Sequence, residues 1–265
     1  MSRNLSERER RALLRSRLLM YHAIDDVCDD PNTLGTSPRR FREQMGHLAS
    51  SGIRGVSMQE LLEAVRRGEE RGLVGLTFDD GYRDFRERAV PILKEFGFTA
   101  TVFVLAGMFG GSNSWKHHVS PHVERRLMDR EDVVRVSEAG MEVGSHFMYH
   151  AVLPDLALEE LRRGLRESRE VLSEIVGSEV QGFCYPYGLL NHEVVREVRE
   201  AGYSYGCSIV ERADGDEFDL LRVPLWDGDN LARLIIKRRF YFTYRRIKKL
   251  LRPGAPGDER VRQGY

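Results

Sequence analysis

Cysteine is scarce in this sequence. Its 265 residues contain three cysteines, Cys28, Cys184 and Cys207, and no C-x-x-C pair. An odd number without that spacing argues against a disulfide framework and against a cysteine-based zinc site. The scarcity fits a reducing compartment.

Neither sign of charge is in excess, and long apolar runs are missing near the N-terminus. The 41 basic and 41 acidic residues give a formal net charge of zero, so a general nucleic-acid role has no electrostatic support. The charged N-terminus is followed by the apolar run Leu18–Tyr21, which is too short for a signal peptide or a membrane span. We therefore expect a cytoplasmic or inner-membrane-associated protein, with an extracellular location as the alternative.

Short apolar runs alternate with amphipathic stretches, and no internal repeat is present. The apolar runs predict strands at Arg17–Tyr21, Gly72–Phe78, Thr99–Leu105, Met141–Gly144, Gly182–Tyr185, Tyr203–Ser208 and Leu221–Leu225. The amphipathic stretches between them predict helices at Pro38–Ser51, Ser57–Arg67, Tyr82–Phe96, Arg130–Ala139, Ala157–Val176 and Glu193–Ala201.

This alternation predicts an α/β fold whose parallel strands are joined by right-handed crossovers. One domain over residues 17–228 follows an N-terminal extension, 1–16, and precedes a basic segment, 229–265. About seven strand–helix units suggest a barrel, complete or incomplete, and a doubly wound open sheet has the same periodicity. In either fold we expect functional side chains at the C-terminal ends of the strands.

The basic segment has an amphipathic pattern. Leu231–Pro253 contains nine basic residues and no acidic one, with apolar residues interleaved. The commoner arrangement is a helix packed on the barrel with a solvated basic face. Peripheral contact with a membrane surface is the alternative.

Two adjacent carboxylates follow a predicted strand directly. The apolar run Leu73–Phe78 leads straight into Asp79, Asp80 and Gly81. Neighbouring acids repel each other, so one usually needs a cation to stay ionised, and the other is then free to act as a base. An Asp-Gly turn with a solvated helix cap would explain the same letters.

Two histidines follow another short predicted strand. His146 and His150 are four residues apart, which in a helical turn would put both imidazoles on one face, within reach of one metal ion. Together with Asp80 they form a set of two imidazoles and one carboxylate suited to zinc or a similar divalent ion. A helix that merely contains histidines is the plainer interpretation.

Aromatic residues accompany a third strand end and a long loop. In the segment Gly182–Gly188 a turn can present a backbone N–H to a developing oxyanion, with Tyr185 and Tyr187 as walls for a sugar ring. Taken alone, the segment is more simply an ordinary turn. Trp115, in the loop before Pro121, can stack on a sugar or belong to the core. The spacing of the nearby histidines 117, 118 and 122 fits no second metal site.

Together these motifs resemble those of the polysaccharide deacetylase family, carbohydrate esterase family 4. The resemblance rests on Leu19–His22, Thr77–Tyr82, Val143–His146 with His150, and Tyr185–Gly188, and extends roughly over residues 18–223. It implies a distorted (β/α) barrel of about seven strands and a divalent metal, commonly zinc. Carried over by position, it implies these roles: Asp79 as catalytic base, Asp80, His146 and His150 as metal ligands, and the Tyr187 N–H as oxyanion donor.

The sequence departs from the common family pattern in two places. No histidine follows His192, although typical members have a catalytic histidine in a Leu-x-His motif near the C-terminus. Most members also have an arginine in the third motif, and here the sequence reads Phe183-Cys184-Tyr185. The chain resembles a permuted branch, similar to poly-N-acetylglucosamine deacetylases, in which His22 would be the general acid and Arg222 would replace the arginine. Alternatively the acid is lost, His22 is structural, and Arg222 forms an ordinary surface ion pair.

We therefore expect hydrolysis of an acetamide on an N-acetylhexosamine-containing polysaccharide, oligosaccharide or glycolipid. O-Deacetylation by the same site is an alternative, as is a non-catalytic carbohydrate- or membrane-surface-binding protein that keeps the fold. Zinc is the expected metal, although this ligand set also accepts cobalt, nickel or iron. The motifs leave the particular sugar and the oligomeric state open.

Overall fold

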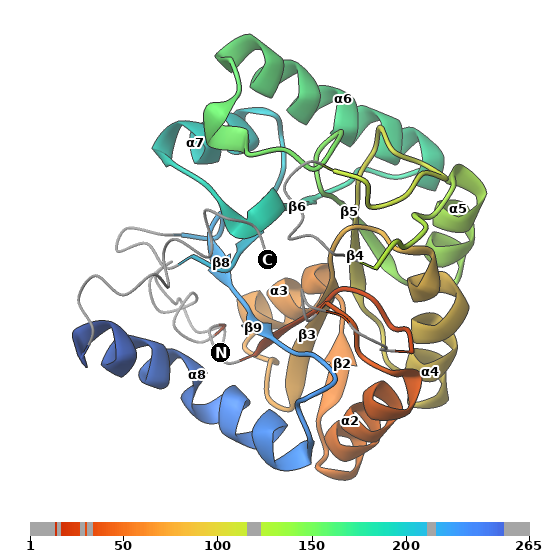
Figure 1. Cartoon of the computed structure of the whole chain (residues 1–265), viewed down its shortest axis with the longest axis vertical. Coiled ribbons are helices and arrows are strands. Elements are labelled where there is room, and N and C mark those ends of the chain that lie inside the picture. Colours follow the sequence, from red (N-terminus) through yellow and green to blue (C-terminus); the bar gives the residue numbers. More distant parts are fainter. Residues whose placement is uncertain are drawn as a thin grey trace.

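In the computed structural model, helices surround a sheet of parallel strands (Figure 1). The structure describes residues 14, 17–26, 30, 34–115, 123–210 and 216–251, with side chains as far as 244 in the last of these ranges. The strands are β1 (Leu18–Tyr21), β2 (Arg54–Val56), β3 (Leu73–Phe78), β4 (Thr101–Val104), β5 (Glu142–Ser145), β6 (Gly182–Cys184), β7 (Tyr205–Ser208), β8 (Leu220–Leu221) and β9 (Val223–Pro224).

A single extended segment brings the two ends of the sheet together. The order of the strands is β8-β7-β6-β5-β4-β3-β1-β9. β8 pairs with β7 and β9 pairs with β1, while only Arg222 separates β8 from β9 in the chain. The sheet is therefore nearly closed into a distorted (β/α) barrel, as predicted, and the open doubly wound alternative is wrong. The path holds eight strands rather than about seven because the expected strand Leu221–Leu225 is split at Arg222.

A short strand that the sequence did not predict distorts the barrel. β2 pairs with the start of β3, where Val56 lies opposite Gly75. The end of β3 pairs with β4 instead, and β1 occupies the other edge of β3 along most of its length. β2 and β4 therefore share one edge of β3. Three residues are too few to show the alternation of side chains on which a strand prediction depends.

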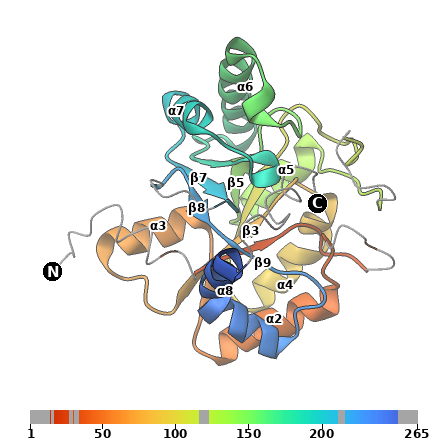
Figure 2. The same cartoon turned by 60° about the vertical axis from the view of Figure 1, so that its left-hand side comes forward.

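The helices that cover the barrel are α2 (Pro38–Ser50), α3 (Met58–Arg67), α4 (Val90–Glu95), α5 (Arg130–Glu138), α6 (Leu158–Val176), α7 (His192–Glu200) and α8 (Leu231–Leu251). The expected helix Tyr82–Phe96 is interrupted, because a π-helical turn at Phe85–Ala89 precedes α4. Pro91 explains the widened turn, since its nitrogen carries no hydrogen to donate to the preceding turn. Figure 2 shows α8 lying beside α2 and β9.

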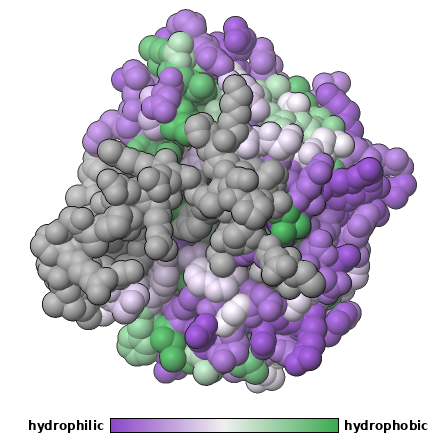
Figure 3. Space-filling view, viewed as in Figure 1, coloured by the Kyte–Doolittle hydropathy of each residue, from purple (hydrophilic) through white to green (hydrophobic). Residues whose placement is uncertain are grey.

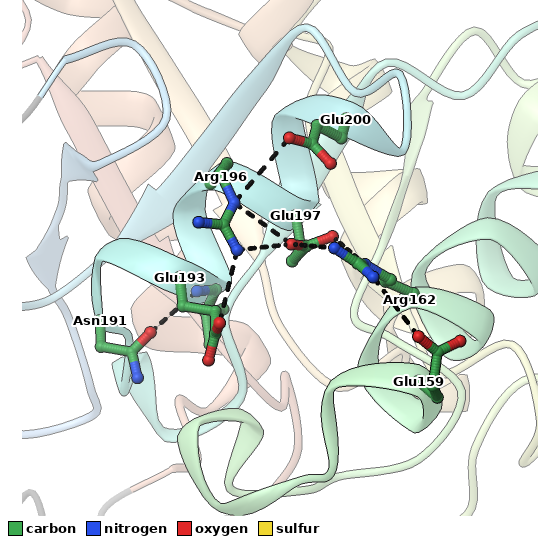
Figure 4. A network of polar contacts seen from close by, with 8 residues as sticks. Glu159, Arg162, Asn191, Glu193, Arg196, Glu197 and Glu200 are labelled. Carbon is green, nitrogen blue, oxygen red and sulfur yellow. Dashed lines mark hydrogen bonds and ion pairs between the residues drawn. The ribbon is translucent and has the colours of Figure 1, made fainter.

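An ion-pair network joins α6 to α7 (Figure 4). Glu197 is 2% exposed and accepts hydrogen bonds from Arg162 at 2.8 and 3.2 Å and from Arg196 at 2.9 Å. The hydrogen bonds from Arg162 lower the pKa of Glu197. Asn191 caps the first turn of α7 by accepting from the Val194 N–H. The network fixes α7 to α6, which packs against β5, the strand that precedes His146.

Alternation of side chains along the strands separates the core from the site. On β1, Leu19 and Tyr21 pack outward into the main hydrophobic core, whereas Leu18 belongs to a second cluster with Phe103 and Tyr205. Met20, two residues beyond Leu18, lines a pocket at the C-terminal end of the barrel. The second cluster therefore forms the base of the pocket.

Candidate metal centre and active site

The structure gathers every predicted site residue around one pocket. Strand ends supply His22 after β1, Asp79 and Asp80 after β3, His146 and His150 after β5, and Tyr185 and Tyr187 after β6. Trp115 reaches the pocket from the connection between β4 and α5, and Arg222 from the junction of β8 and β9. The remaining lining residues are Met20, Leu34, Gly188 and Ile209. The pocket lies where parallel strands of a barrel place functional groups.

Asp80, His146 and His150 form a cluster with the dimensions of a metal site. One potential ligand atom of each lies within 4.8 Å of the others. The Nε2 atoms of His146 and His150 are 3.3 and 3.4 Å from Asp80 Oδ1. Two ligands held about 2.1 Å from a tetrahedral ion are about 3.4 Å apart, so the spacing matches one small divalent cation.

The buried carboxylate of Asp80 supports the same conclusion. Asp80 is 3% exposed, and its Oδ1 makes no hydrogen bond within the described part of the chain. A buried acceptor without a donor is costly, whereas a cation between this oxygen and the two imidazoles would satisfy it. The residues present therefore fit a divalent metal.

The prediction of a helical turn between His146 and His150 is wrong. His146 follows β5 in an extended segment, and its N–H donates to Val104 O at 2.8 Å. Phe147 then adopts a left-handed conformation, with φ of 73°, and the chain bends to His150. Asp80 is also left-handed, with φ of 70°. Such strain in residues other than glycine concentrates at functional sites, where the surrounding structure holds it in place.

Helix α6 supplies the support for this turn. The Phe147 ring is fully buried, and a Cβ atom added at Gly164 would lie 2.3 Å from its Cζ. The Phe147 N–H donates to Ser145 Oγ at 3.1 Å. Only a glycine at position 164 lets the ring approach the helix this closely, so α6 helps to hold the two histidines at their spacing.

Cys184 contacts both His146 and Arg222, through two different atoms. The sequence did not indicate either contact. Its backbone oxygen lies 2.8 Å from His146 Nδ1, so that nitrogen carries the proton and Nε2 is left to bind a metal. Its thiol lies 3.1 Å from Arg222 Nη2. A small residue at this position leaves room for the guanidinium that enters from the barrel seam.

Arg222 and Asp79 form a buried, bidentate ion pair. Nη1 and Nη2 donate to the two carboxylate oxygens at 2.6 and 2.7 Å, and Nη1 also donates to Thr77 Oγ1 at 3.1 Å. Arg222 is 1% exposed, so the alternative of an ordinary surface ion pair is wrong. Burial alone would raise the pKa of Asp79, but the charge and hydrogen bonds of Arg222 hold it below its usual value. Asp79 is therefore ionised at neutral pH.

His22 lies on the other side of the Asp79 carboxylate. Its Nε2 is 4.0 Å from Asp79 Oδ2, and its side chain is 17% exposed. The parallel register of β1 and β3 produces this proximity, since Tyr21 pairs with Phe78 and the Asp79 N–H donates to Tyr21 O at 3.0 Å. His22 thus lies beside the base candidate and lines the same pocket.

Aromatic rings line the pocket around His150. Trp115 stacks on the imidazole, with ring centres 4.6 Å apart, and Tyr187 meets it edge-on at 4.1 Å. Tyr187 is left-handed, with φ of 57°. Tyr185 is 1% exposed, and its hydroxyl donates to Phe218 O at 2.7 Å. Trp115 and Tyr187 therefore present more of their rings to the pocket than Tyr185 does.

The histidines at 117, 118 and 122 are outside the described residues. Two acids that follow β9 make structural contacts rather than line the pocket. Asp227 accepts from the Ser37 N–H and hydroxyl at the start of α2, and Asp229 pairs with Lys237 of α8 at 2.6 Å. Both acids hold the segment before α8 to the barrel.

Comparisons with known proteins agree with this architecture. The poly-β-1,6-N-acetyl-D-glucosamine N-deacetylase of Staphylococcus aureus (strain MRSA252) is 25% identical over 76% of this chain and 71% of its own length. The protein YxkH of Bacillus subtilis (strain 168) is 27% identical over 72% of this chain, and the match spans 63% of YxkH.

Solved structures show the same fold. The Streptococcus pyogenes deacetylase PplD, in complex with acetate, superposes with a TM-score of 0.71, at 23% identity over 83% of this chain and 96% of PplD. IcaB from Ammonifex degensii superposes with a TM-score of 0.68, at 22% identity over 83% of this chain and 95% of IcaB. The family model for polysaccharide deacetylases matches residues 66–206. The chain belongs to the polysaccharide deacetylase family.

Proposed function

We propose that this protein is a metal-dependent hydrolase that removes N-acetyl groups from N-acetylhexosamine units of a polysaccharide, oligosaccharide or glycolipid. It would act on a carbon–nitrogen bond other than a peptide bond. The observation that carries the proposal is the cluster of Asp80, His146 and His150 beside the ionised Asp79 in one pocket. The name of the S. aureus relative makes β-1,6-linked N-acetylglucosamine the first substrate to test.

Asp80, His146 and His150 would hold the metal, with zinc as the first candidate and cobalt, nickel or iron as alternatives. A bound ion of this kind polarises a carbonyl and lowers the pKa of water, to about 7 in the best-known zinc enzymes. His146 is oriented for this purpose by its contact with the Cys184 carbonyl oxygen.

Asp79 is the proposed general base. Its carboxylate takes a proton from the water whose oxygen bonds to the acetyl carbon. Arg222 keeps the carboxylate ionised and fixes its plane through two hydrogen bonds. The two hydrogen bonds from Arg222 also keep the Asp79 carboxylate from turning toward His146 and His150. Asp79 can therefore act as the base while its neighbour Asp80 binds the metal.

His22 is the proposed general acid. An amide anion is too poor a leaving group to depart unaided, so the nitrogen must receive a proton as its bond to the acetyl carbon breaks. His22 Nε2 lies 4.0 Å from Asp79 Oδ2, which places an acid next to the base in the same pocket. The products are acetate and a free amine on the sugar.

Backbone and rings complete the proposed site. The N–H of Tyr187, which its left-handed conformation orients, is the candidate donor to the developing oxyanion. Trp115 and Tyr187 offer aromatic surface to a sugar ring, and Tyr185 supports the wall behind them. These assignments make the pocket a site for one sugar unit.

The test combines metal analysis with acetate release. We expect about one divalent ion per chain and acetate from β-1,6-linked N-acetylglucosamine oligomers. Asp80→Ala should lose both the metal and the acetate release. Asp227→Asn is the control: it removes an acid that accepts from Ser37 at the start of α2, outside the pocket, and it should keep both properties. A protein that binds no metal after reconstitution and releases no acetate would contradict the proposal, and release from O-acetylated xylan alone would replace it with an esterase.

A further inference from the structure

Helix α8 has two apolar faces, and only one is covered by the described part of the barrel. Its inner face carries Leu234, which is fully buried, and Tyr241 and Phe242, which pack against the main core. The predicted packing of this helix on the barrel is therefore present.

Two sets of polar contacts anchor the inner face of α8: those of Lys237, within the helix, and those of the segment that precedes the helix. Lys237 Nζ donates to Asp229 Oδ2 at 2.6 Å and to Pro224 O at 2.9 Å, and lies 3.4 Å from the centre of the Trp226 ring. Gln44 of α2 donates to the backbone oxygen of Asp229 at 2.8 Å. These contacts set which side of α8 faces outward.

The outer face is not the purely basic surface that a solvated helix would have. Ile236, Phe240 and Tyr244 follow one another at intervals of four residues and are 57%, 56% and 62% exposed. Side chains four apart lie on one side of a helix, so they form a continuous stripe. In Figure 3 hydrophobic surface gathers at the lower left, where Figure 1 places α8. Large apolar side chains gathered in this way mark a binding surface.

The charge of the segment indicates what the stripe binds. Residues 231–253 contain nine basic residues and no acidic one, and the exposed Arg233 and Arg239 flank the stripe. Two copies of so basic a segment would repel each other, which disfavours a dimer through this face. An anionic lipid surface, by contrast, attracts the charges and accepts the apolar stripe. None of the helices in the described ranges is long and apolar enough to cross a bilayer.

We propose that α8 docks the protein on a membrane containing anionic lipids. The helix lies in the plane of the interface, with Ile236, Phe240 and Tyr244 inserted about 5–10 Å into the boundary between headgroups and acyl chains. The exposed Arg233 and Arg239 contact the phosphates. Because the inner face stays packed on the barrel, docking needs no unfolding of the domain. This inference does not depend on the reaction proposed for the pocket.

Vesicle flotation of the full chain tests the docking. Vesicles of phosphatidylcholine with phosphatidylglycerol should carry the protein, vesicles of phosphatidylcholine alone should carry far less, and salt should weaken binding. Replacing the stripe by Ile236→Ser with Phe240→Ser should lower the partition coefficient on the order of tenfold or more. Arg239→Glu should also lower it, whereas the control Arg163→Glu, at another exposed arginine on α6, should not.

Folding and self-association are checked in the same variants. An unchanged thermal transition and unchanged acetate release from a soluble oligosaccharide would show that the serine variants are folded. Equal binding to both vesicle types, or full binding by the double serine variant, would overturn the proposal. A concentration-dependent dimer in sedimentation, abolished by the same substitutions without any vesicle binding, would assign the stripe to a second copy instead.

Discussion

Arg222 and Asp79 form a bidentate ion pair across the seam where the barrel closes, with nitrogen–oxygen distances of 2.6 and 2.7 Å. The two residues are 143 positions apart in the sequence. Arg222 lies between β8 and β9, so the segment that closes the sheet also delivers the guanidinium to the proposed base. Closure of the fold and ionisation of Asp79 are thereby coupled.

Replacing Arg222 should change the pH dependence of turnover. In Arg222→Gln, burial would act on Asp79 without the compensating charge, so its pKa rises and the acidic limb of the kcat/KM profile moves to higher pH. Removing one partner of a buried pair should also cost about 3–5 kcal/mol of unfolding free energy at neutral pH. Urea unfolding and a pH–rate profile measure the two effects.

Arg222→Lys is the matched variant. It keeps the positive charge but loses the fork of donors, so it should restore part of the low pKa of Asp79 and less of the turnover. A pH profile of Arg222→Gln that coincides with that of the wild type would contradict the role assigned to the pair.

His22→Ala should separate proton donation from metal binding. We expect turnover on an N-acetyl substrate to fall about a hundredfold or more, with metal content unchanged. Hydrolysis of p-nitrophenyl acetate should fall far less, since a nitrophenolate leaves without needing a proton. Equal losses on the two substrates would show that His22 acts on structure rather than as the acid.

Removal of the metal should abolish activity and lower the melting temperature. A ligand that binds only the folded state stabilises it, so chelation should lower the thermal transition and added zinc or cobalt should restore it. His150→Ala should give the same low transition with or without chelator, because one of the three ligands is missing. A transition in the wild type that does not respond to chelator would argue against a resident metal.

Gly164→Ala should weaken metal binding from outside the pocket. The added methyl group would meet the Phe147 ring 2.3 Å away and disturb the left-handed turn between the two histidines. We expect a loss of about 1–3 kcal/mol of stability and roughly 10–100-fold weaker metal affinity, measured by competition with a chromophoric chelator.

Gly46→Ala is the control for that substitution. Gly46 also lies within a helix, α2, but an added Cβ there would meet only Phe96 ring atoms at 3.6 and 3.7 Å, which is ordinary contact. Because alanine favours a helix over glycine, this variant should be as stable as the wild type or more stable by about 0.5–1 kcal/mol. If both variants changed metal affinity equally, the support assigned to α6 would be wrong.

The sequence predicted the parts of this site that depend on local pattern. The apolar run of β3 ends at the two aspartates, and parallel strands bring such ends together, so Asp79 and Asp80 could be placed near His146. The partners of these residues were harder to find. The resemblance named Arg222 as the substitute for the missing arginine, but not its pairing with Asp79, which is a contact between distant parts of the chain.

Local backbone conformation was the second feature that could not be predicted from the sequence. The spacing of His146 and His150 suggested a helical turn, but the left-handed Phe147 produces the same proximity through a bend after a strand. Phenylalanine gives no sign of this in sequence, because tertiary packing against Gly164 imposes it. The contact of the Cys184 backbone oxygen with His146 likewise depends on strand register and leaves no trace in residue type.

Asp84 should make the stability of the fold depend on pH. It accepts a hydrogen bond from the Ile24 N–H at 2.8 Å and so ties the segment after His22 to the one after Asp80. Burial raises its pKa to about 7, above the value of about 3.9 that an unfolded chain would have. The neutral, protonated carboxyl is therefore the form that the fold favours. Its stabilising contribution is complete below about pH 4 and is lost as the pH rises toward about 7.

Asp84→Asn keeps the acceptor oxygen and removes the ionisation. The variant should be more stable than the wild type at about pH 8, by roughly 2–4 kcal/mol, and the two should converge near pH 4. Urea unfolding across this range measures the difference. The wild-type curve should fall more steeply with rising pH, because the folded protein retains a proton that the unfolded chain has already released. Parallel curves would mean that Asp84 is ionised in the folded state and that the neighbouring arginines, Arg88 and Arg125, compensate for its burial.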